Sequence, residues 1–252
     1  MEKRIDKIKQ KLESEGKVSV TDLSELYNVT EETIRRDLEK LKNEGFVTRT
    51  FGGAVLNTSI NREHIHFFKR RSINNESKKK IAELSVGYCN QFRTIMADSS
   101  TTVMETLKKL ENNSEFTVIT FSAQIFQELN GTKMKIISTG GIYDADTLSF
   151  KGVLAKESIS KYNVDIAFLS CKGLDINMGI MDSTESEAVL KTEMAKRAKK
   201  VALLVDHSKF NQSAFVNFLD WEDVDYIITD KYPSDEWVEF CKEKNIQLVY
   251  WF

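Results

Sequence analysis

The sequence has little proline, little cysteine and no long apolar run. Its 252 residues include one Pro and three Cys, and 29% of them are charged. No stretch approaches the roughly 20 apolar residues that a membrane-spanning helix needs, which excludes an integral membrane protein of that kind. The cysteines, Cys89, Cys171 and Cys241, are odd in number and far apart, which argues against a disulfide framework or a zinc cluster.

The start of the chain also lacks the apolar core of a secretory signal, because it is charged from its second residue. We therefore expect a cytoplasmic protein. His64 and His66 have no third metal ligand near them in the sequence, so surface histidines are a better interpretation than a metal site. No cofactor is expected.

A net charge of −2, from 36 basic and 38 acidic residues, at first argues against a nucleic-acid partner. The charge is unevenly distributed, however: residues 1–56 carry none, residues 57–80 carry +5 and residues 81–252 carry −7. Seven of the nine arginines lie in the first 71 residues. A solvated helical surface would account for charge alone. The guanidinium fork also matches phosphates and the guanine edge, so the clustering favours DNA binding.

Residues 1–56 have the pattern of a small winged helix-turn-helix domain. Apolar stripes predict a first helix that ends near Gly16 and a second that begins at the cap Thr21. A third helix is expected from the cap Thr30 to Gly45, with two carboxylates in its first turn. Two helices joined by a tight turn form a helix-turn-helix motif.

The third helix is expected to expose hydroxyl and basic side chains. At 100° per residue, Ile34, Leu38 and Leu41 share the buried face, and the N-terminal half of the opposite face is free to reach base edges. An extended stretch follows and breaks at Gly52-Gly53, which predicts a hairpin wing whose Arg49 could touch phosphate or the neighbouring groove. The predicted DNA-binding residues are Thr30, Thr33, Arg35, Arg36, Lys40 and Arg49.

Several motifs in these residues have a long, fixed spacing. They are Gly16-x-Val18-x-Val20, then Thr30-x-x-Thr33-Ile34-Arg35-Arg36-Asp37-Leu38, and finally Gly45-Phe46-Val47-x-Arg49 with Gly52-Gly53-Ala54. This run resembles the N-terminal signature of DeoR-type transcriptional repressors. The resemblance implies that Thr33, Arg35 and Arg36 meet double-stranded DNA, and that a homo-oligomer, dimer or tetramer, binds a repeated operator.

After a basic linker over residues 57–72, residues 73–252 alternate extended and helical runs, which predicts an α/β domain large enough for its own core. The expected strands are 94–97, 117–121, 134–138, 165–170, 201–205, 226–229 and 246–250. The expected helices are 101–111, 123–130, 153–161, 185–199 and 234–244.

Polar and glycine-containing loops follow several predicted strands, where ligands bind in open α/β sheets. The hydroxyls and backbone N–H groups of residues 98–102 at a helix start suit an anion such as phosphate, although a capping turn uses the same residues. Small residues at 139–141 would let a ligand approach the backbone. Charged residues follow further strands at 171–174, 179–182 and 206–210.

These loops also resemble the DeoR family, now its C-terminal effector domain, over residues 73 to 230. That domain is similar in fold to ribose-5-phosphate isomerase and usually senses a phosphorylated sugar. The family loop often reads D-x-G-[ST]-T, whereas Ser100 replaces the glycine here, and Glu187 sits where the family has a glutamate. The effector-binding residues implied by the resemblance are Asp98, Ser100, Thr101, Thr102, Thr139, Gly140, Gly141, Lys172, Gly173 and Lys209.

The sequence therefore predicts a transcriptional repressor of carbohydrate-metabolism genes, controlled by a phosphorylated sugar, and not an enzyme. The main alternative is a sugar-phosphate isomerase-like enzyme with a DNA-binding head, in which Lys172, Asp182 and Lys209 transfer protons. No dense acid/base cluster at short spacing supports that alternative. A winged helix used for protein contacts is a third possibility, against which the arginine clustering argues.

Overall fold

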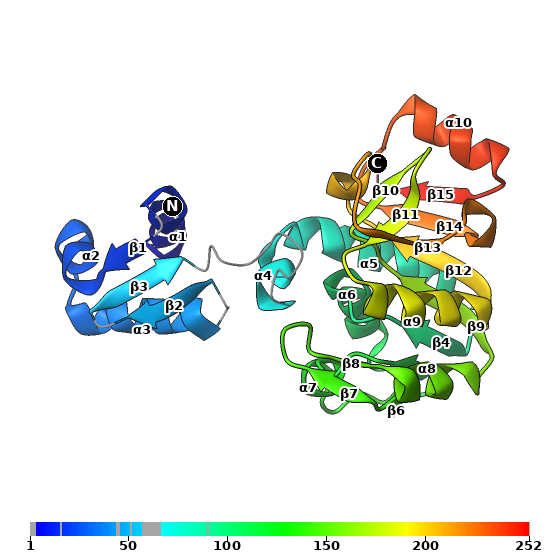
Figure 1. The fold of residues 1–252 in the computed structure, drawn as a ribbon, viewed down its shortest axis with the longest axis horizontal. Helices are drawn as coiled ribbons and strands as arrows, with labels where there is room; N and C mark the ends of the chain where they lie inside the picture. The colour runs from blue at the N-terminus through cyan, green and yellow to red at the C-terminus, as the bar shows by residue number, and fades with distance from the viewer. Residues whose placement is uncertain are drawn as a thin grey trace. The chain divides into compact units, whose positions relative to one another are not determined.

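The computed structural model describes residues 4–15, 17–43, 46–50, 52–56, 67–89 and 91–251. The chain divides into two compact units, Met1–Ser72 and Ile73–Phe252, which we call the head and the sensor (Figure 1). Gly16, Gly45, His64 and His66, named above, lie outside the described residues. In the described part of the chain, no helix is both long and apolar enough to cross a membrane.

The head is a winged helix-turn-helix. Its described elements are α1 (Arg4–Glu15), β1 (Lys17–Ser19), α2 (Val20–Tyr27), α3 (Glu31–Asn43), β2 (Val47–Thr50), β3 (Gly53–Leu56) and α4 (Phe67–Ser72). The predicted core face of α3 is confirmed, because Ile34, Leu38 and Leu41 are fully buried. Helix α2 begins earlier than predicted: its cap is Ser19, whose hydroxyl accepts a hydrogen bond from the Asp22 amide.

The wing is the hairpin β2–β3, which extends into a three-stranded antiparallel sheet of order β1-β3-β2. Its two glycines act differently. Gly52 has φ +84°, a conformation that a side chain disfavours. Gly53 is already paired in β3, and a Cβ there would lie 2.1 Å from the carbonyl oxygen of Val18. Gly53 therefore allows the wing to pack against β1.

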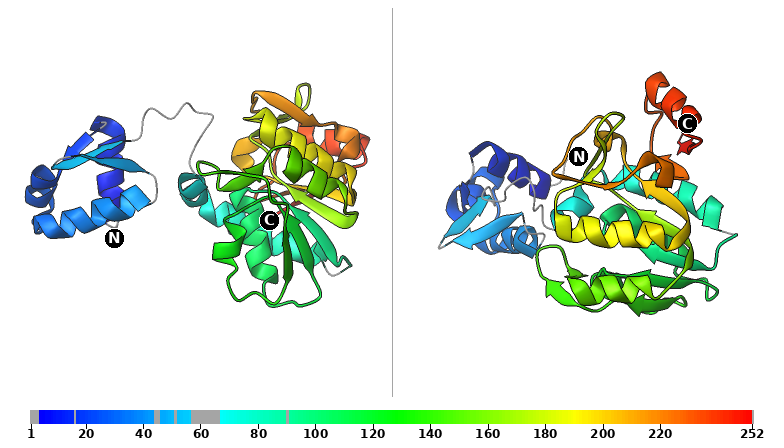
Figure 2. Two further views of the ribbon diagram at one scale, coloured as in Figure 1. Left: turned by 60° about the horizontal axis from the view of Figure 1, so that its bottom comes forward. Right: turned by 45° about the vertical axis from the view of Figure 1, so that its right-hand side comes forward.

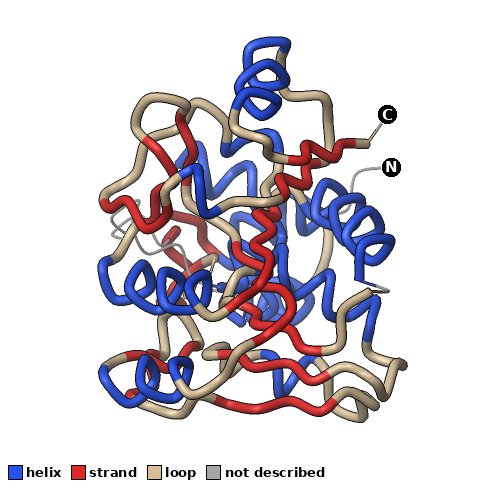
Figure 3. The backbone as a smooth tube through the Cα atoms, turned by 90° about the vertical axis from the view of Figure 1, so that its right-hand side faces the viewer, coloured by secondary structure: helices blue, strands red, loops and turns tan. Residues whose placement is uncertain are grey.

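The sensor is built on a seven-stranded parallel sheet (Figures 1 and 3). In sheet order the strands are β15 (Gln247–Tyr250), β14 (Tyr226–Thr229), β12 (Ala198–Leu204), β9 (Val164–Leu169), β4 (Thr94–Ala97), β5 (Thr117–Thr120) and β6 (Lys135–Ser138). From β4 the chain proceeds outward to β5 and β6, then returns to β9 on the other side of β4 and proceeds outward again. The order therefore reverses between β4 and β9, and ligands bind at such switch points in α/β sheets.

Helices cover both faces of this sheet, which completes the predicted α/β architecture. They are α5 (Asn75–Cys89), α6 (Thr101–Leu110), α7 (Ile125–Glu128), α8 (Val153–Ser160), α9 (Glu185–Lys196) and α10 (Asp235–Glu243), with 3-10 turns at His207–Lys209 and Trp221–Asp223. The pair α5 and α6 lies on one face, and the pair α8 and α9 lies on the other (Figures 1 and 2).

Two small antiparallel sheets were not among the predicted elements. One pairs β7 (Ile142–Asp144) with β8 (Ser149–Lys151), and the other joins β10 (Gly173–Asp175), β11 (Gly179–Asp182) and β13 (Val216–Leu219). Their strands have three or four residues and, unlike β4 and β14, none contains three consecutive apolar residues, so no local pattern distinguishes them from loops.

Candidate functional sites

The exposed face of α3 carries arginines that are held by glutamates one turn earlier. The Arg35 guanidinium lies 2.7 Å from the Glu31 carboxylate, and Arg36 Nε lies 3.4 Å from Glu32 Oε1. The Arg36 side chain is 76% exposed. Such i,i+4 pairs in water are weak, so an incoming phosphate can replace the glutamate without a large penalty.

The two threonines at the start of α3 form its cap. Thr30 Oγ1 accepts a hydrogen bond from the Thr33 amide at 3.3 Å, and the two hydroxyls lie 2.9 Å apart. The observed role of these side chains is therefore to stabilise the first turn of α3. Lys40 is exposed on the same helix but does not line the pocket described next.

Arg49 connects the wing to α3. It donates a hydrogen bond from Nη1 to the carbonyl oxygen of Arg35 at 3.1 Å, while its buried Nε has no partner among the described residues. A shallow pocket of ≈ 450 Å³ lies between wing and helix. It is lined by Glu32, Arg35, Arg36, Glu39, Lys42, Arg49 and Thr50. The structure thus brings Arg35, Arg36 and Arg49 together on one surface.

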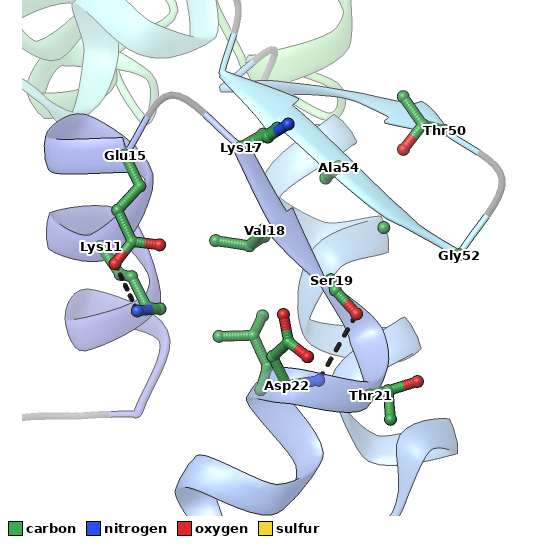
Figure 4. A pocket seen from close by; sticks show the side chains of 12 residues that line it. Lys11, Glu15, Lys17, Val18, Ser19, Thr21, Asp22, Thr50, Gly52 and Ala54 are labelled. Carbon is green, nitrogen blue, oxygen red and sulfur yellow. Dashed lines mark hydrogen bonds and ion pairs between the residues drawn. The ribbon is translucent and has the colours of Figure 1, made fainter.

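A second pocket of the head, ≈ 550 Å³, lies between α1, β1, α2 and the wing (Figure 4). Lys11 is ion-paired with Glu15 at 2.5 Å, and Lys17 and Asp22 also line the pocket. Its charges therefore balance, unlike the arginine-rich surface beside α3.

In the sensor, Asp98 lies at the switch point, directly after β4. Its Oδ1 accepts a hydrogen bond from the Ser100 amide at 2.9 Å, and its Oδ2 accepts one from the Ser170 amide at 2.7 Å. Ser170 follows β9, so this buried carboxylate joins the ends of the two strands at which the sheet order reverses. Since a carboxylate repels phosphate, Asp98 shapes the loop through which an anion would be bound.

Ser100 is the N-cap of α6. Its hydroxyl accepts a hydrogen bond from the Val103 amide at 3.2 Å. Its φ of −75° suits any residue, so the backbone does not need the glycine that the family loop has. Thr101 and Thr102 form the first turn of α6, where backbone N–H groups have no intrahelical acceptor. N–H groups in this position can donate hydrogen bonds to an anion.

Lys191 on α9, which was not among the predicted effector-binding residues, forms a buried ionic cluster with Asp98 and Asp182. Its Nζ lies 2.5 Å from Asp182 Oδ2 and 3.2 Å from Asp98 Oδ2, and donates to the carbonyl oxygen of Ser170 at 2.8 Å. Burial alone would lower the pKa of Lys191, but the carboxylates of Asp182 and Asp98 outweigh it and raise the pKa. Lys191 therefore stays charged and holds three chain segments together.

A sequence signal for this cluster exists. Lys191 lies three residues after Ala188 and three before Met194, on the apolar face of its helix. Beside it, Lys151 on β8 lies 2.8 Å from Asp144 and 3.7 Å from Glu187. A lysine within an apolar stripe indicates a buried charge, but the sequence does not indicate which residues pair with it.

Two further predicted residues, Lys172 and Lys209, lie near the switch point. Both are half-buried, after β9 and in the turn after β12 respectively, and these strands are neighbours. Burial raises the pKa of Cys171 to about 12, and the positive charges of Lys209 and Lys191 partly oppose this. Packing rather than ligand binding explains the glycine at position 173, because a Cβ there would lie 2.3 Å from the carbonyl oxygen of Gln212.

The Thr139-Gly140-Gly141 loop lies farther away, since β6 is two strands from β4 and strands are about 4.8 Å apart. Gly140 and Gly141 have φ +63° and +116°. A Cβ on Gly141 would lie 2.6 Å from the Lys151 carbonyl oxygen, whereas one on Gly140 would meet no atom within 4 Å. Gly140 is thus the glycine with open space beside it.

The first residues of the sensor are bonded to the same edge of the sheet. Asn74, with φ +52°, donates from Nδ2 to Asp206 Oδ1 at 3.0 Å and to Ser208 Oγ at 3.2 Å. Asp206 caps the turn that contains Lys209. The segment that follows the head is therefore in direct contact with one of the predicted effector loops.

Comparisons with known proteins agree with this two-part organisation. Residues 4–60 match the DeoR-like helix-turn-helix domain, and residues 73–231 match the DeoR C terminal sensor domain. Over 98% of this chain and 95% of the relative, the sequence is 38% identical to an uncharacterized HTH-type transcriptional regulator, YulB, of Bacillus subtilis. Over 99% of this chain and 100% of the relative, it is 32% identical to the L-fucose operon activator of Haemophilus influenzae.

Among solved structures, ribose 5-phosphate isomerase from Plasmodium falciparum is similar at 17% identity and a TM-score of 0.37. The match covers 53% of this chain and 52% of that one. This likeness is too distant to support an argument about activity.

Proposed function

The chain belongs to the DeoR family of transcriptional regulators, and we propose that it represses carbohydrate-metabolism genes and that a phosphorylated sugar bound in its sensor controls its affinity for the operator. The observation that carries the DNA side is the surface formed by Arg35, Arg36 and Arg49. Arg49 fixes the wing on α3, and the two helix arginines are exposed and only weakly paired. Inserting α3 into a major groove would place Arg36 near base edges and Arg49 near the backbone.

The effector side rests on the switch point between β4 and β9. The first-turn N–H groups of α6 offer neutral donors, and Lys172 and Lys209 offer positive charge from neighbouring strands. Lys191 compensates two buried carboxylates, which would otherwise repel a phosphate. A phosphorylated sugar fits this combination, with the phosphate at α6 and its hydroxyls toward the open backbone at Gly140.

Control of DNA binding requires that the effector bind two states of the protein unequally. The hydrogen bonds from Asn74 to Asp206 and Ser208 support a route, because they join the start of the sensor to the loop of Lys209. An effector that moves this loop would act directly on the segment that leads to the head. We further propose that the protein binds its operator as a homo-oligomer.

The test is a fluorescence-anisotropy titration of the full chain on DNA from upstream of its own gene, with a panel of phosphosugars. Arg36→Ala should weaken binding to the operator by about 1–3 kcal/mol and binding to scrambled DNA much less. Lys133→Ala, which removes an exposed lysine of the sensor, is the control. An equal loss on both DNAs would show that Arg36 touches only phosphate, and absence of any specific complex would refute the proposal.

The enzyme alternative has lost its support. The relatives are named as transcriptional regulators, and Asp182, one of its three proton-transfer candidates, is ion-paired with the buried Lys191. The Asp182 carboxylate also accepts a hydrogen bond from the Ser183 amide, so it is engaged on both oxygens.

A further inference from the structure

The hydroxyl of Ser122 is buried and has no hydrogen-bond partner among the described residues, and we propose that it binds a hydroxyl group of the phosphorylated sugar in the sensor. Ser122 is 1% exposed. A buried hydroxyl without a partner costs free energy, so a protein rarely keeps one unless a ligand or a bound water supplies the bond. This inference rests on the proposed function of the sensor and adds a recognition residue to it.

Ser122 lies at the carboxyl edge of the sheet, two residues after the end of β5. Strand β5 lies between β4, which leads to the loop before α6, and β6, which leads to Gly140. Neighbouring strands are about 4.8 Å apart, so a ligand that reaches from the first turn of α6 to Gly140 crosses the end of β5. Ser122 is therefore placed between the two ends of such a ligand.

Hydrogen bonds fix the backbone at Ser122 and on both sides of it. Its own amide donates to Thr120 Oγ1 at 3.0 Å. The carbonyl oxygen of the preceding residue accepts a hydrogen bond from the Phe150 amide at 2.7 Å, and the amide of the following residue donates to the Leu148 carbonyl oxygen at 2.8 Å. A hydroxyl on a backbone held in this way loses little conformational freedom when it binds a ligand, which favours selective recognition.

Other hydroxyls near this edge of the sheet already have partners. Ser138 Oγ accepts a hydrogen bond from the Gly140 amide at 3.1 Å. Ser149 forms an antiparallel bridge with Ser122, but its Oγ lies 2.8 Å from Thr147 Oγ1. These hydroxyls are engaged within the protein, so Ser122 retains its full hydrogen-bonding capacity for a ligand.

Two further buried polar atoms of the described sensor lack a partner, and both lie elsewhere. Thr229 ends β14, which is four strands from β5 in the sheet. Trp221, whose Nε1 is unpartnered, packs its ring edge-on against Trp237 and Phe240, with ring centroids 5.6 and 5.0 Å away. Neither follows a strand next to β4, whereas Ser122 does.

The first experiment is isothermal titration calorimetry of the full chain without DNA. The probes are inorganic phosphate, glycerol 3-phosphate, ribose 5-phosphate and fructose 6-phosphate. The phosphosugar that binds the parent most tightly should bind Ser122→Ala about tenfold more weakly, because the sugar hydroxyl loses its buried partner. Inorganic phosphate has no such hydroxyl and should bind both proteins to within about twofold.

Ser85→Ala is the matched control, because the Ser85 hydroxyl is equally buried but donates to the Ile81 carbonyl oxygen at 2.7 Å. It should leave the affinity for the phosphosugar unchanged. An unchanged affinity of Ser122→Ala would mean that a bound water alone satisfies the hydroxyl, and would overturn the proposal. A parent that binds none of the probes would instead refute the phosphosugar effector itself, and this inference with it.

Monodeoxy analogues of the tightest phosphosugar identify the hydroxyl that Ser122 binds. One analogue should bind the parent about tenfold more weakly than the complete sugar does, but should bind Ser122→Ala as well as the complete sugar, because the variant already lacks the interaction. If every analogue loses the same factor on both proteins, Ser122 contacts no sugar hydroxyl. The proposal then fails although the effector class stands.

Urea unfolding of the ligand-free proteins separates recognition from misfolding. Ser122→Ala removes no hydrogen bond of the free protein, so its urea midpoint should equal or exceed that of the parent. Ser85→Ala removes a bond and should lower the midpoint. A Ser122→Ala variant less stable than the parent would mean that its hydroxyl is bonded in the free protein, and would also overturn the proposal.

Discussion

The head and the sensor both place charged side chains at their proposed sites, but they hold them differently. On α3 of the head, the pairs Glu31–Arg35 and Glu32–Arg36 lie in water, with side chains 43% to 76% exposed. At the switch point of the sensor, the Lys191 side chain is 4% exposed, and its partners Asp98 and Asp182 are equally buried.

The difference separates charges that can change partners from charges that cannot. An exposed pair contributes about 0–1 kcal/mol, so the head arginines can leave their glutamates for phosphate. A buried pair has lost its water, and removing one member leaves the other uncompensated. The sensor's ionic cluster therefore fixes the positions of the chain segments that it joins, whereas the exposed pairs of the head leave their arginines able to meet phosphate.

The largest effect is expected from Lys191→Met. It leaves Asp98 and Asp182 buried without their cation and should destabilise the sensor by about 3–5 kcal/mol. Differential scanning calorimetry should show this loss in the sensor transition and leave the head unchanged. Lys133→Met removes an exposed lysine of the same unit and should shift the transition little. Equal shifts for both variants would mean that the buried cluster is not special.

The head should be sensitive to backbone packing rather than to charge, and Gly53→Ala tests this. The added Cβ meets the Val18 carbonyl oxygen at 2.1 Å, so β1 and β3 must separate. Overpacking of this kind costs about 1–3 kcal/mol, and specific DNA binding should be lost with the wing. Gly87→Ala on α5 meets no atom within 4 Å and is the matched control. A fully stable Gly53→Ala head would contradict the close approach.

Removing the acidic partner from an exposed ion pair should raise DNA affinity, whereas the two substitutions above lower stability or DNA binding. Glu32→Gln releases Arg36 and deletes a negative charge from the DNA-facing surface, so operator affinity should rise by a few-fold at low salt. Thermal stability should change by less than about 0.5 kcal/mol. Anisotropy at several salt concentrations checks both the gain and its loss as salt screens the charge. A weaker complex would indicate that Glu32 itself contacts DNA.

The last prediction concerns Asp144, an intermediate case whose side chain is 32% exposed. Burial alone would raise the pKa of Asp144, but the ion pair with Lys151 and the amides of Thr147 and Asp146 outweigh it and lower the pKa to about 2. A depressed pKa stabilises the folded state above the unfolded value of 3.8, and this contribution is lost as pH falls toward about 2.

Asp144→Asn should remove that part of the pH dependence. Urea unfolding between about pH 5 and pH 2.5 would then show a smaller decline in stability for the variant than for the parent. The amide can still accept hydrogen bonds, so stability near the low end of this range should be similar in both proteins. An unchanged slope would mean that other carboxylates dominate acid unfolding.

Local sequence patterns predicted the elements whose own apolar side chains determine their secondary structure. Strands β4 and β14 have the predicted bounds because both are buried apolar runs, and the burial of Ile34 follows from helical periodicity. The α2 cap was placed two residues late, since Ser19 and Thr21 are both good caps and packing decided between them. DeoR-type motifs predicted the family, and the matches to both DeoR domains confirm it.

Contacts between distant residues could not be predicted. Asp98 accepts a hydrogen bond from the amide of Ser170, 72 positions later. Its cation, Lys191, lies on a helix whose prediction carried no information about its contact with Asp98. The hairpins β7–β8 and β10–β11 depend on the segments that they cover rather than on their own sequence. Gly141 and Gly173 were predicted to bind the ligand, yet the structure explains them by packing, because a Cβ there would clash with the carbonyl oxygens of Lys151 and Gln212.

The pairing of β4 with β9 also orders events during synthesis. The described core of the head lies between Ile8 and Ala54, so the head can fold soon after these residues leave the ribosome. The sensor must wait, because Asp98 acquires its neighbouring strand only near residue 166 and its cation only at Lys191. For the interval of translation between these points, a nascent chain carries a complete helix-turn-helix head without a complete C-terminal domain.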